Sequence, residues 1–294
     1  MTHRMGITVV TLAACSCFLA APQARAQSMG AQQGTQQQGT QQQTQEQKPS
    51  LQNPTPQKPA PPPVDPKEEA AYKAFFEIKP AAPADYDAQI KAGEEFVKNY
   101  PQSRYLVVVY SRLTNAYFER QHLDKMYAAA DKTLQLNPND LSVLTLVGWV
   151  IPRGSPNAPD YSAKLAKAEQ YEKHALELLA TLTKPAELTD DQFAQTKASA
   201  VSQAHSGLGL VYFREGKNDE SATELAQATE GNPKPDPTDY FVLGVVDEKL
   251  NKFGDAAKAF DSCAQIASQL QAQCKQGATE SKSKAGNQLQ PPKP

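Results

Sequence analysis

The sequence has almost no excess charge of either sign, and this scarcity excludes one large class of partner. Its 294 residues hold 30 Lys and Arg against 32 Asp and Glu, which gives a formal net charge of −2 at pH 7. The acidic and basic residues are interspersed, as on an ordinary solvated surface. Proteins that bind nucleic acid need a basic patch or stripe. We therefore expect no nucleic-acid partner.

Metal-binding and nucleotide-binding signatures are also lacking. Beyond the first 26 residues the histidines are His122, His174 and His205, and none has a second His or Cys at metal-ligand spacing. Gly207 and Gly209 do not follow a predicted strand, and they lack the third glycine of a dinucleotide-binding loop. We expect neither a metal nor a cofactor.

Catalytic patterns are missing as well. The acidic pairs Glu94-Glu95 and Asp190-Asp191 show no spacing that identifies a general acid and base, and the second pair fits the negative charge favoured at a helix start. The sequence gives no positive reason to expect an enzyme. An enzyme of unknown type therefore ranks behind the two binding hypotheses given below.

Only one long apolar run occurs, and it lies at the N-terminus. Residues 5–21 follow a short basic start and carry no charge. Small residues at positions 24 and 26 match the two positions that signal peptidase reads, which predicts cleavage between Ala26 and Gln27. The run is shorter than the ~20 residues that comfortably span a bilayer. We expect residues 1–26 to be a signal peptide, and the mature chain to be exported to the periplasm or cell envelope without a membrane span.

A lipid anchor is the alternative fate of this leader. Leu12-Ala13-Ala14-Cys15 resembles a bacterial lipobox, in which the cysteine becomes the lipidated first residue. The very short leader before Cys15 and the apolar residues after it count against lipidation. The alternative stays open at this point.

Low-complexity sequence follows the leader. Residues 27–47 are mostly Gln with Gly and Thr, and residues 48–66 are rich in Pro. Such compositions bury too little apolar surface to offset the entropy of ordering. We expect residues 27–66 to be a disordered linker, flexible in its Gln-rich part and extended in its Pro-rich part.

A helix–turn–helix pattern organises the rest of the chain. Residues 107–140 carry apolar or small side chains at helical spacing in two runs, with a polar break at residues 119–122 and a stop at Asn137-Pro138. The positions are Tyr110, Leu113, Thr114 and Tyr117, then Met126, Ala130, Thr133 and Leu134. Neither helix can bury its apolar face alone, so the unit requires stacked neighbours.

The pattern recurs with a period of about 34 residues. Leu144 and Gly148 repeat Tyr110 and Thr114 after 34 residues, and Tyr240 repeats His205 after 35. The period fails at residues 152–160 and 182–189. We expect a helical repeat domain over residues 67–284, in which Asp85 caps the second helix and a last capping helix covers residues 268–283. Residues 285–294 are expected to be a disordered tail.

These residues resemble the tetratricopeptide repeat (TPR) family, and in particular exported bacterial TPR proteins. The family pattern of aromatic, Leu-Gly and Tyr, then Ala, aromatic, Ala and Pro, is found in three copies. They read Tyr110, Leu113-Thr114, Tyr117, Met126, Ala130, Thr133, Pro138; His205, Leu208-Gly209, Tyr212, Ser221, Leu225, Ala228, Pro233; and Tyr240, Leu243-Gly244, Asp247, Ala256, Phe260, Cys263. The resemblance implies an all-α, right-handed superhelical α-solenoid of TPR-like helix pairs.

The resemblance also implies a function and a site. Arrays of this kind bind a protein or peptide in a groove lined by the first helix of each pair. The groove positions that we single out are Asn115, Phe118, Phe213, Arg214, Phe241 and Lys249. The alternative is that the aromatic side chains pack against neighbouring helices. We expect a non-catalytic binding scaffold in the bacterial cell envelope, or alternatively an accessory of outer-membrane or envelope assembly anchored by lipid at Cys15.

Two cysteines remain in the mature chain, Cys263 and Cys274. On one straight helix, eleven residues would separate them by roughly 16 Å, too far for a disulfide. A turn near residues 268–271 would make a disulfide feasible in an oxidising compartment. Otherwise Cys263 is explained as a small packing residue. The sequence leaves both readings open.

Overall fold

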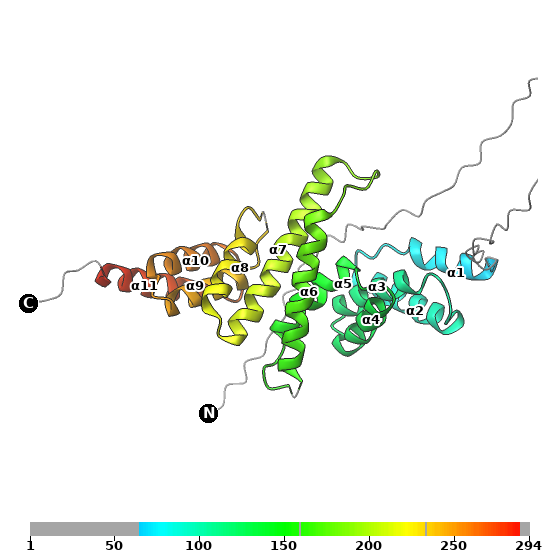
Figure 1. Cartoon of the computed structure of the whole chain (residues 1–294), viewed down its shortest axis with the longest axis horizontal. Helices are drawn as coiled ribbons and strands as arrows, with labels where there is room; N and C mark the ends of the chain where they lie inside the picture. The colour runs from blue at the N-terminus through cyan, green and yellow to red at the C-terminus, as the bar shows by residue number, and fades with distance from the viewer. Residues whose placement is uncertain (1–64, 159, 233, 289–294) are drawn as a thin grey trace, which may run out of the picture.

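A computed structural model describes residues 65–158, 160–232 and 234–288, and this part of the chain is a row of helices without a strand (Figure 1). The helices are α1 Pro66–Glu77, α2 Pro83–Asn99, α3 Leu106–Glu119, α4 Leu123–Leu136, α5 Leu141–Val150, α6 Tyr161–Thr181, α7 Asp190–Glu215, α8 Asn218–Thr229, α9 Pro237–Lys249, α10 Phe253–Gln265 and α11 Gln271–Gln288, with a short 3-10 turn, η1 Ile151–Arg153, after α5.

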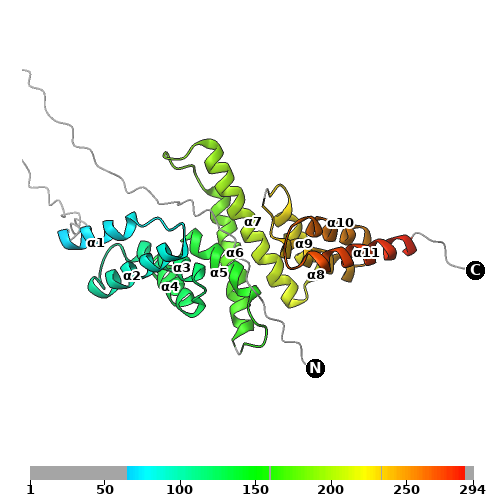
Figure 2. The same ribbon diagram turned by 180° about the vertical axis from the view of Figure 1, so that it is seen from behind.

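The helices pair with their neighbours in the sequence and follow one another along the long axis of the molecule. Close backbone contacts join α3 with α4, α5 with α6, α7 with α8 and α9 with α10, while α11 packs on α10. Figures 1 and 2 show α1 and α11 at opposite ends and the two longest helices, α6 and α7, crossing the middle of the row. The fold is therefore an all-α solenoid of helix pairs.

Side-chain caps mark the starts of α1, α5, α7 and α9. Asp65 accepts from the amide of Lys67 over 2.9 Å, and Asp236 accepts from that of Thr238 over 2.8 Å. Thr189 and Gln192 exchange both bonds of a capping box at the start of α7. Such side chains satisfy amides that have no partner within the helix. The local sequence therefore fixes where these helices begin.

Small residues let the paired helices approach closely. A Cβ added to Gly209 in α7 would lie 2.6 Å from Cγ of Leu225 in α8. A Cβ added to Gly244 in α9 would lie 2.8 Å from the ring of Phe260 in α10. In these two pairs the glycine of the first helix thus receives the large residue of the second helix, which is the packing that the repeat pattern implies.

The structure corrects several expected boundaries. Asp85 does not precede α2: it lies in its first turn and accepts from the amides of Ala81 and Ala82 over 3.1 and 2.9 Å. Pro66, which we assigned to the linker, opens α1, because its fixed φ suits the first helical position. The last helix covers residues 271–288 rather than 268–283. Residues 285–288, which we expected to belong to the disordered tail, are therefore helical. The final turn of this helix is held by the side-chain amide of Gln288, which donates to the carbonyl of Asn251 over 3.2 Å.

Three expected segments fall outside the described residues. These are the signal peptide at 1–26, the linker up to residue 64 and the end of the tail at 289–294. Across 65–158, 160–232 and 234–288, no helix combines the length and apolarity that crossing a membrane requires.

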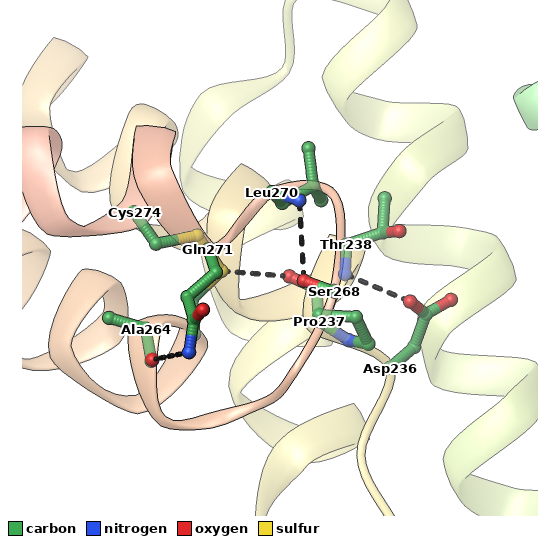
Figure 3. The surroundings of a disulfide bond; sticks show 9 residues. Asp236, Pro237, Thr238, Ala264, Ser268, Leu270, Gln271 and Cys274 are labelled. Atoms are coloured by element: carbon green, nitrogen blue, oxygen red, sulfur yellow. Dashed lines mark hydrogen bonds between the residues drawn. A yellow bond between two sulfur atoms is a disulfide. The ribbon is translucent and has the colours of Figure 1, made fainter. Parts of the chain in front are cut away.

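The chain reverses between α10 and α11 and brings Cys263 and Cys274 together (Figure 3). The amide of Leu270 donates to Ser268 over 3.3 Å, and the side chain of Gln271 donates to the carbonyl of Ala264 over 3.0 Å. Cys263 and Cys274 form a disulfide with their Cα atoms 5.7 Å apart. Of the two readings that the sequence left open, the structure contains the disulfide, which fastens the last helix to the array.

Candidate partner-binding site

The first helices of the pairs line one side of the solenoid. In close backbone contact, α3 touches α5, α5 touches α7, α7 touches α9 and α9 touches α11. By contrast, α4, α6, α8 and α10 make no such contact with one another in the described part of the chain. In a curved solenoid the helices on the concave side lie closer together than those on the convex side. The helices that contact one another therefore form the inner side. We call α3, α5, α7, α9 and α11 the inner row, and α4, α6, α8 and α10 the outer row.

An aromatic pair joins α3 and α5 on this row. The rings of Phe118 and Trp149 meet edge to face, with centroids 6.1 Å apart, and both side chains are half-buried. Trp149 is the one tryptophan of the sequence. Edge-to-face aromatic pairs hold a fixed geometry. The pair therefore gives a rigid, partly exposed apolar surface.

Arg153, in η1, links the aromatic pair to α7 and α9. Its guanidinium lies 3.7 Å from the centroid of the Trp149 ring, close enough for a cation–π interaction. Its Nη2 donates to Asp236 over 2.9 Å, to Ser206 over 3.0 Å and, more weakly, to Asp239 over 3.5 Å. Ser206 in turn donates to Asp239 over 2.7 Å. One side chain thus ties together three successive first helices.

The carboxyl group of Asp239 is almost fully buried beneath this arginine. Burial raises its pKa to about 7; Arg153 opposes the rise, Asp236 adds to it, and the hydroxyl of Ser206 opposes it. Near neutral pH the carboxyl group therefore exchanges between its charged and neutral forms, which alters its pairing with Arg153.

A third carboxyl group, that of Glu172 in α6, lies behind the cluster. Its side chain is fully buried, and neither oxygen has a hydrogen-bond partner within the described residues. A Cβ added to Gly148 in α5 or to Gly207 in α7 would lie 2.5 or 2.2 Å from its Oε1. Burial raises the pKa of Glu172 well above its usual value, and the Arg153 charge opposes this only in part. Glu172 thus lies where α5, α6 and α7 cross, and its burial favours the neutral form of its carboxyl group.

The structure brings some of the predicted groove residues together. The ammonium of Lys249 lies 4.7 Å from the ring centroid of Phe213, at the ends of α9 and α7. Phe118 meets Trp149, as described above, and Asn115 lies half-buried one turn earlier on α3. These positions lie on the inner row.

The other predicted residues have structural partners. Phe241 meets Phe260 edge to face at 5.8 Å and packs against the apolar clusters of the last two pairs. Arg214 is exposed, but its Nε donates to the carbonyl of Pro152 over 3.0 Å. Phe241 thus packs as the alternative reading described, and Arg214 holds η1 against α7.

Sequence reasoning missed Trp149, Arg153, Asp236 and Asp239. A shift of 34 residues from Asn115 gives Trp149, and the same shift from Glu119 gives Arg153. The period therefore contained a signal for both, which the insertion after residue 151 obscured. For Asp236 and Asp239 the sequence signals only the start of a helix.

Comparison with known proteins finds similarity in structure but not in sequence families. No family model matches the chain, and no curated protein matches it. Solved structures similar to it include a thermophilic TPR protein of Thermus thermophilus, with 15% identity over 74% of this chain and 99% of that one and a TM-score of 0.44. Another is PilW, a type IV pilus biogenesis factor, with 14% identity over 77% and 96% and a TM-score of 0.47. A third is a tetratricopeptide repeat protein from Parabacteroides merdae, with 14% identity over 73% and 91% and a TM-score of 0.33. In its helix pairs, its inner row and its glycine contacts, the chain is an all-α solenoid of TPR-like repeats.

Proposed function

We propose that this protein is a non-catalytic scaffold that binds a peptide segment of a partner protein along the inner row. The observation that carries the proposal is the continuous contact from Phe118 through Trp149 to Arg153 and Asp236. It sets a half-buried aromatic surface beside a fixed cation and a fixed anion. Aromatic and arginine side chains dominate the binding energy of most protein interfaces.

The rigidity of these groups favours binding. Arg153 is held by Trp149 on one side and by acceptors in α7 and α9 on the other, so little side-chain entropy remains to be lost on association. Because the groups come from separate helix pairs, the surface exists only when the pairs are stacked. A partner would place an apolar side chain against the aromatic pair and polar groups against Arg153 and Asp236.

The single tryptophan makes this proposal testable without knowing the partner. Peptides selected from a displayed random library against the full mature chain would be titrated while Trp149 fluorescence is recorded. We expect binding to change the emission, and Phe118→Ala to weaken affinity about tenfold or more, as loss of a hot-spot residue does. Leu136→Ala is the matched control, because Leu136 is an exposed apolar residue on the outer row. Peptides that bind without changing Trp149 emission, with equal affinity for Phe118→Ala, would refute the site.

We further propose that the scaffold works in the cell envelope. The predicted leader at residues 1–26 and the disulfide between Cys263 and Cys274 support this, since disulfides persist in oxidising compartments. Mass spectrometry of the mature N-terminus in a fractionated host tests it. A chain that starts at Gln27 supports a free exported protein, and a diacylated Cys15 supports the lipid-anchored accessory of envelope assembly. An intact Met1 in the cytoplasmic fraction would contradict both.

A further inference from the structure

The tyrosine of the repeat pattern has a constant role in two of the pairs. In α3, the hydroxyl of Tyr117 donates to Glu94 of α2 over 2.7 Å. In α7, the hydroxyl of Tyr212 donates to Glu169 of α6 over 3.3 Å. Both rings are buried. Each tyrosine thus fills the space between its own first helix and the second helix that precedes it.

In α9 an aspartate takes this position. Asp247 lies 35 residues after Tyr212 and is much smaller than a tyrosine. At the corresponding place the structure has a hollow of about 470 Å³ between α8, α9 and α10. Small residues, Ala222 and Ala226, face it from α8, so nothing else occupies the space that a tyrosine ring would take.

Asp247 lines this hollow and has no partner in it. The residue is only 6% exposed, yet its carboxyl group makes no hydrogen bond or ion pair within the described residues. The two lysines of the hollow act on Asp247 through their charge alone, because each is closer to another carboxylate. Lys258 pairs with Asp255 at 2.8 Å, and Lys252 lies 3.9 Å from Asp219. The carboxylate of Asp247 faces the open hollow without a hydrogen-bond donor, so a positively charged donor placed there would form a charge-assisted hydrogen bond with it.

We propose that this hollow binds an organic cation, a primary ammonium or guanidinium group on an apolar stem, with Asp247 as its counter-ion. Tyr240 and Leu243 line the hollow and would cover the stem, and an aromatic ring also attracts a cation. The hollow is lined by α8 and α10 of the outer row and by Tyr240, Leu243 and Asp247 of α9. None of these residues belongs to the inner-row site, so this proposal does not rest on the function proposed above.

The charges of the hollow select a cation over other ligands. The charged residues of the lining are Asp247 and Asp255 with Lys252 and Lys258, and Asp247 is the one carboxylate among them that makes no ion pair within the described residues. An anion would meet the unpaired carboxylate of Asp247. A purely apolar ligand would bury that carboxylate further without supplying a donor. The volume lies in the range of small-molecule sites and also admits a lysine or arginine side chain of a partner.

Two probes distinguish a free cation from a side chain of a protein. Agmatine carries a guanidinium and an amine on an alkyl stem, and acetyl-Ala-Arg-Ala-amide presents the same guanidinium on a peptide. Acetyl-Ala-Gln-Ala-amide is the neutral control. Binding to the full mature chain would be measured by saturation-transfer NMR with titration at pH 7.5. We expect at least one basic probe to bind and the glutamine peptide not to bind. Binding of agmatine supports a free organic cation as the ligand, and binding of the peptide alone supports a partner's side chain.

Three variants decide whether Asp247 holds the cation. Asp247→Asn should weaken binding about tenfold or more, because it removes a charge-assisted hydrogen bond. Asp247→Tyr should abolish binding without lowering the thermal midpoint, since it restores the residue that fills this space in the α3 and α7 pairs. Asp261→Asn is the matched control: Asp261 lies on α10 and pairs with Lys282 outside the hollow, so affinity should be unchanged. Absence of binding by both basic probes, or equal binding by Asp247→Asn and the wild type, would overturn the proposal.

Discussion

The guanidinium of Arg153 donates to the carboxylate of Asp236 over 2.9 Å, although 83 residues separate them in the chain. In most solenoids each repeat contacts only its neighbours. Here the turn after α5 reaches across α7 to the start of α9. The curvature of the inner row is thereby fixed by a side-chain tie as well as by helix packing.

Removing this tie should destabilise the protein more than removing an ordinary surface ion pair. Arg153→Ala would leave Asp236 and Asp239 largely buried without a cation, which we expect to lower the free energy of unfolding by about 2–4 kcal/mol. Urea unfolding monitored by circular dichroism measures it. Arg104→Ala is the control, because Arg104 pairs with Glu69 in a half-exposed position where pairs contribute about 0–1 kcal/mol. Equal losses in the two variants would show that the tie is not structural.

The buried carboxyl group of Glu172 should make the protein less stable as pH rises. Its pKa in the folded state lies well above its unfolded value, so its favourable contribution is complete below the unfolded pKa and is lost as pH rises towards the folded one. Glu172→Gln cannot ionise, and we expect it to exceed the wild type in stability more at pH 8 than at pH 5. Urea unfolding at both pH values gives the comparison.

Asp239 also makes the protein less stable as pH rises, because its pKa is raised in the folded state. Glu172→Gln should therefore flatten the pH dependence of stability without abolishing it. Glu177→Gln, an exposed site on the same helix, should leave the wild-type dependence intact. A Glu172→Gln protein with the full wild-type dependence would mean that Glu172 does not carry this effect.

Two helical glycines should respond to alanine in opposite directions. At Gly209 the new Cβ would lie 2.6 Å from Cγ of Leu225, so we expect a loss of about 1–3 kcal/mol from overpacking. At Gly254 nothing lies within 4 Å, so we expect a gain of about 0.5–1 kcal/mol from helix propensity. Thermal unfolding of both variants tests the pair. A Gly209→Ala protein as stable as Gly254→Ala would contradict the close helix approach.

Much of the fold could be predicted because its determinants are local and repeat. Leu208-Gly209 and Leu243-Gly244 mark the first helices of their pairs at the expected spacing, and their glycine contacts follow directly. The cation–acid cluster could not be predicted in the same way. The period relates Arg153 to Glu119, but Arg153 reaches Asp236 only because α5, α7 and α9 stack at particular angles, which no local pattern encodes.

The disulfide between Cys263 and Cys274 could be predicted only in part. Whether Cys263 meets Cys274 depends on where α10 ends, and the sequence places that end only within a few residues. The turn after Gln265 settles the distance at 5.7 Å between Cα atoms.

The disulfide should stabilise the last helix. It closes a loop of about eleven residues, for which chain entropy predicts about 2–3 kcal/mol. Cys263→Ser with Cys274→Ser should therefore unfold at a lower temperature than the oxidised wild type, and reductant should lower the wild-type midpoint towards that of the variant. A midpoint that responds neither to reductant nor to the double substitution would show that the bond contributes nothing to stability.

Hydrogen exchange on addition of a selected peptide tests the inner-row site most directly. Backbone amides of the full chain would be followed by mass spectrometry with and without the peptide. We predict that protection rises at residues 115–120 and 147–154 and at the start of α9, where Phe118, Trp149, Arg153 and Asp236 lie. Protection confined to α4, α6, α8 and α10, with those segments unchanged, would contradict binding along the inner row.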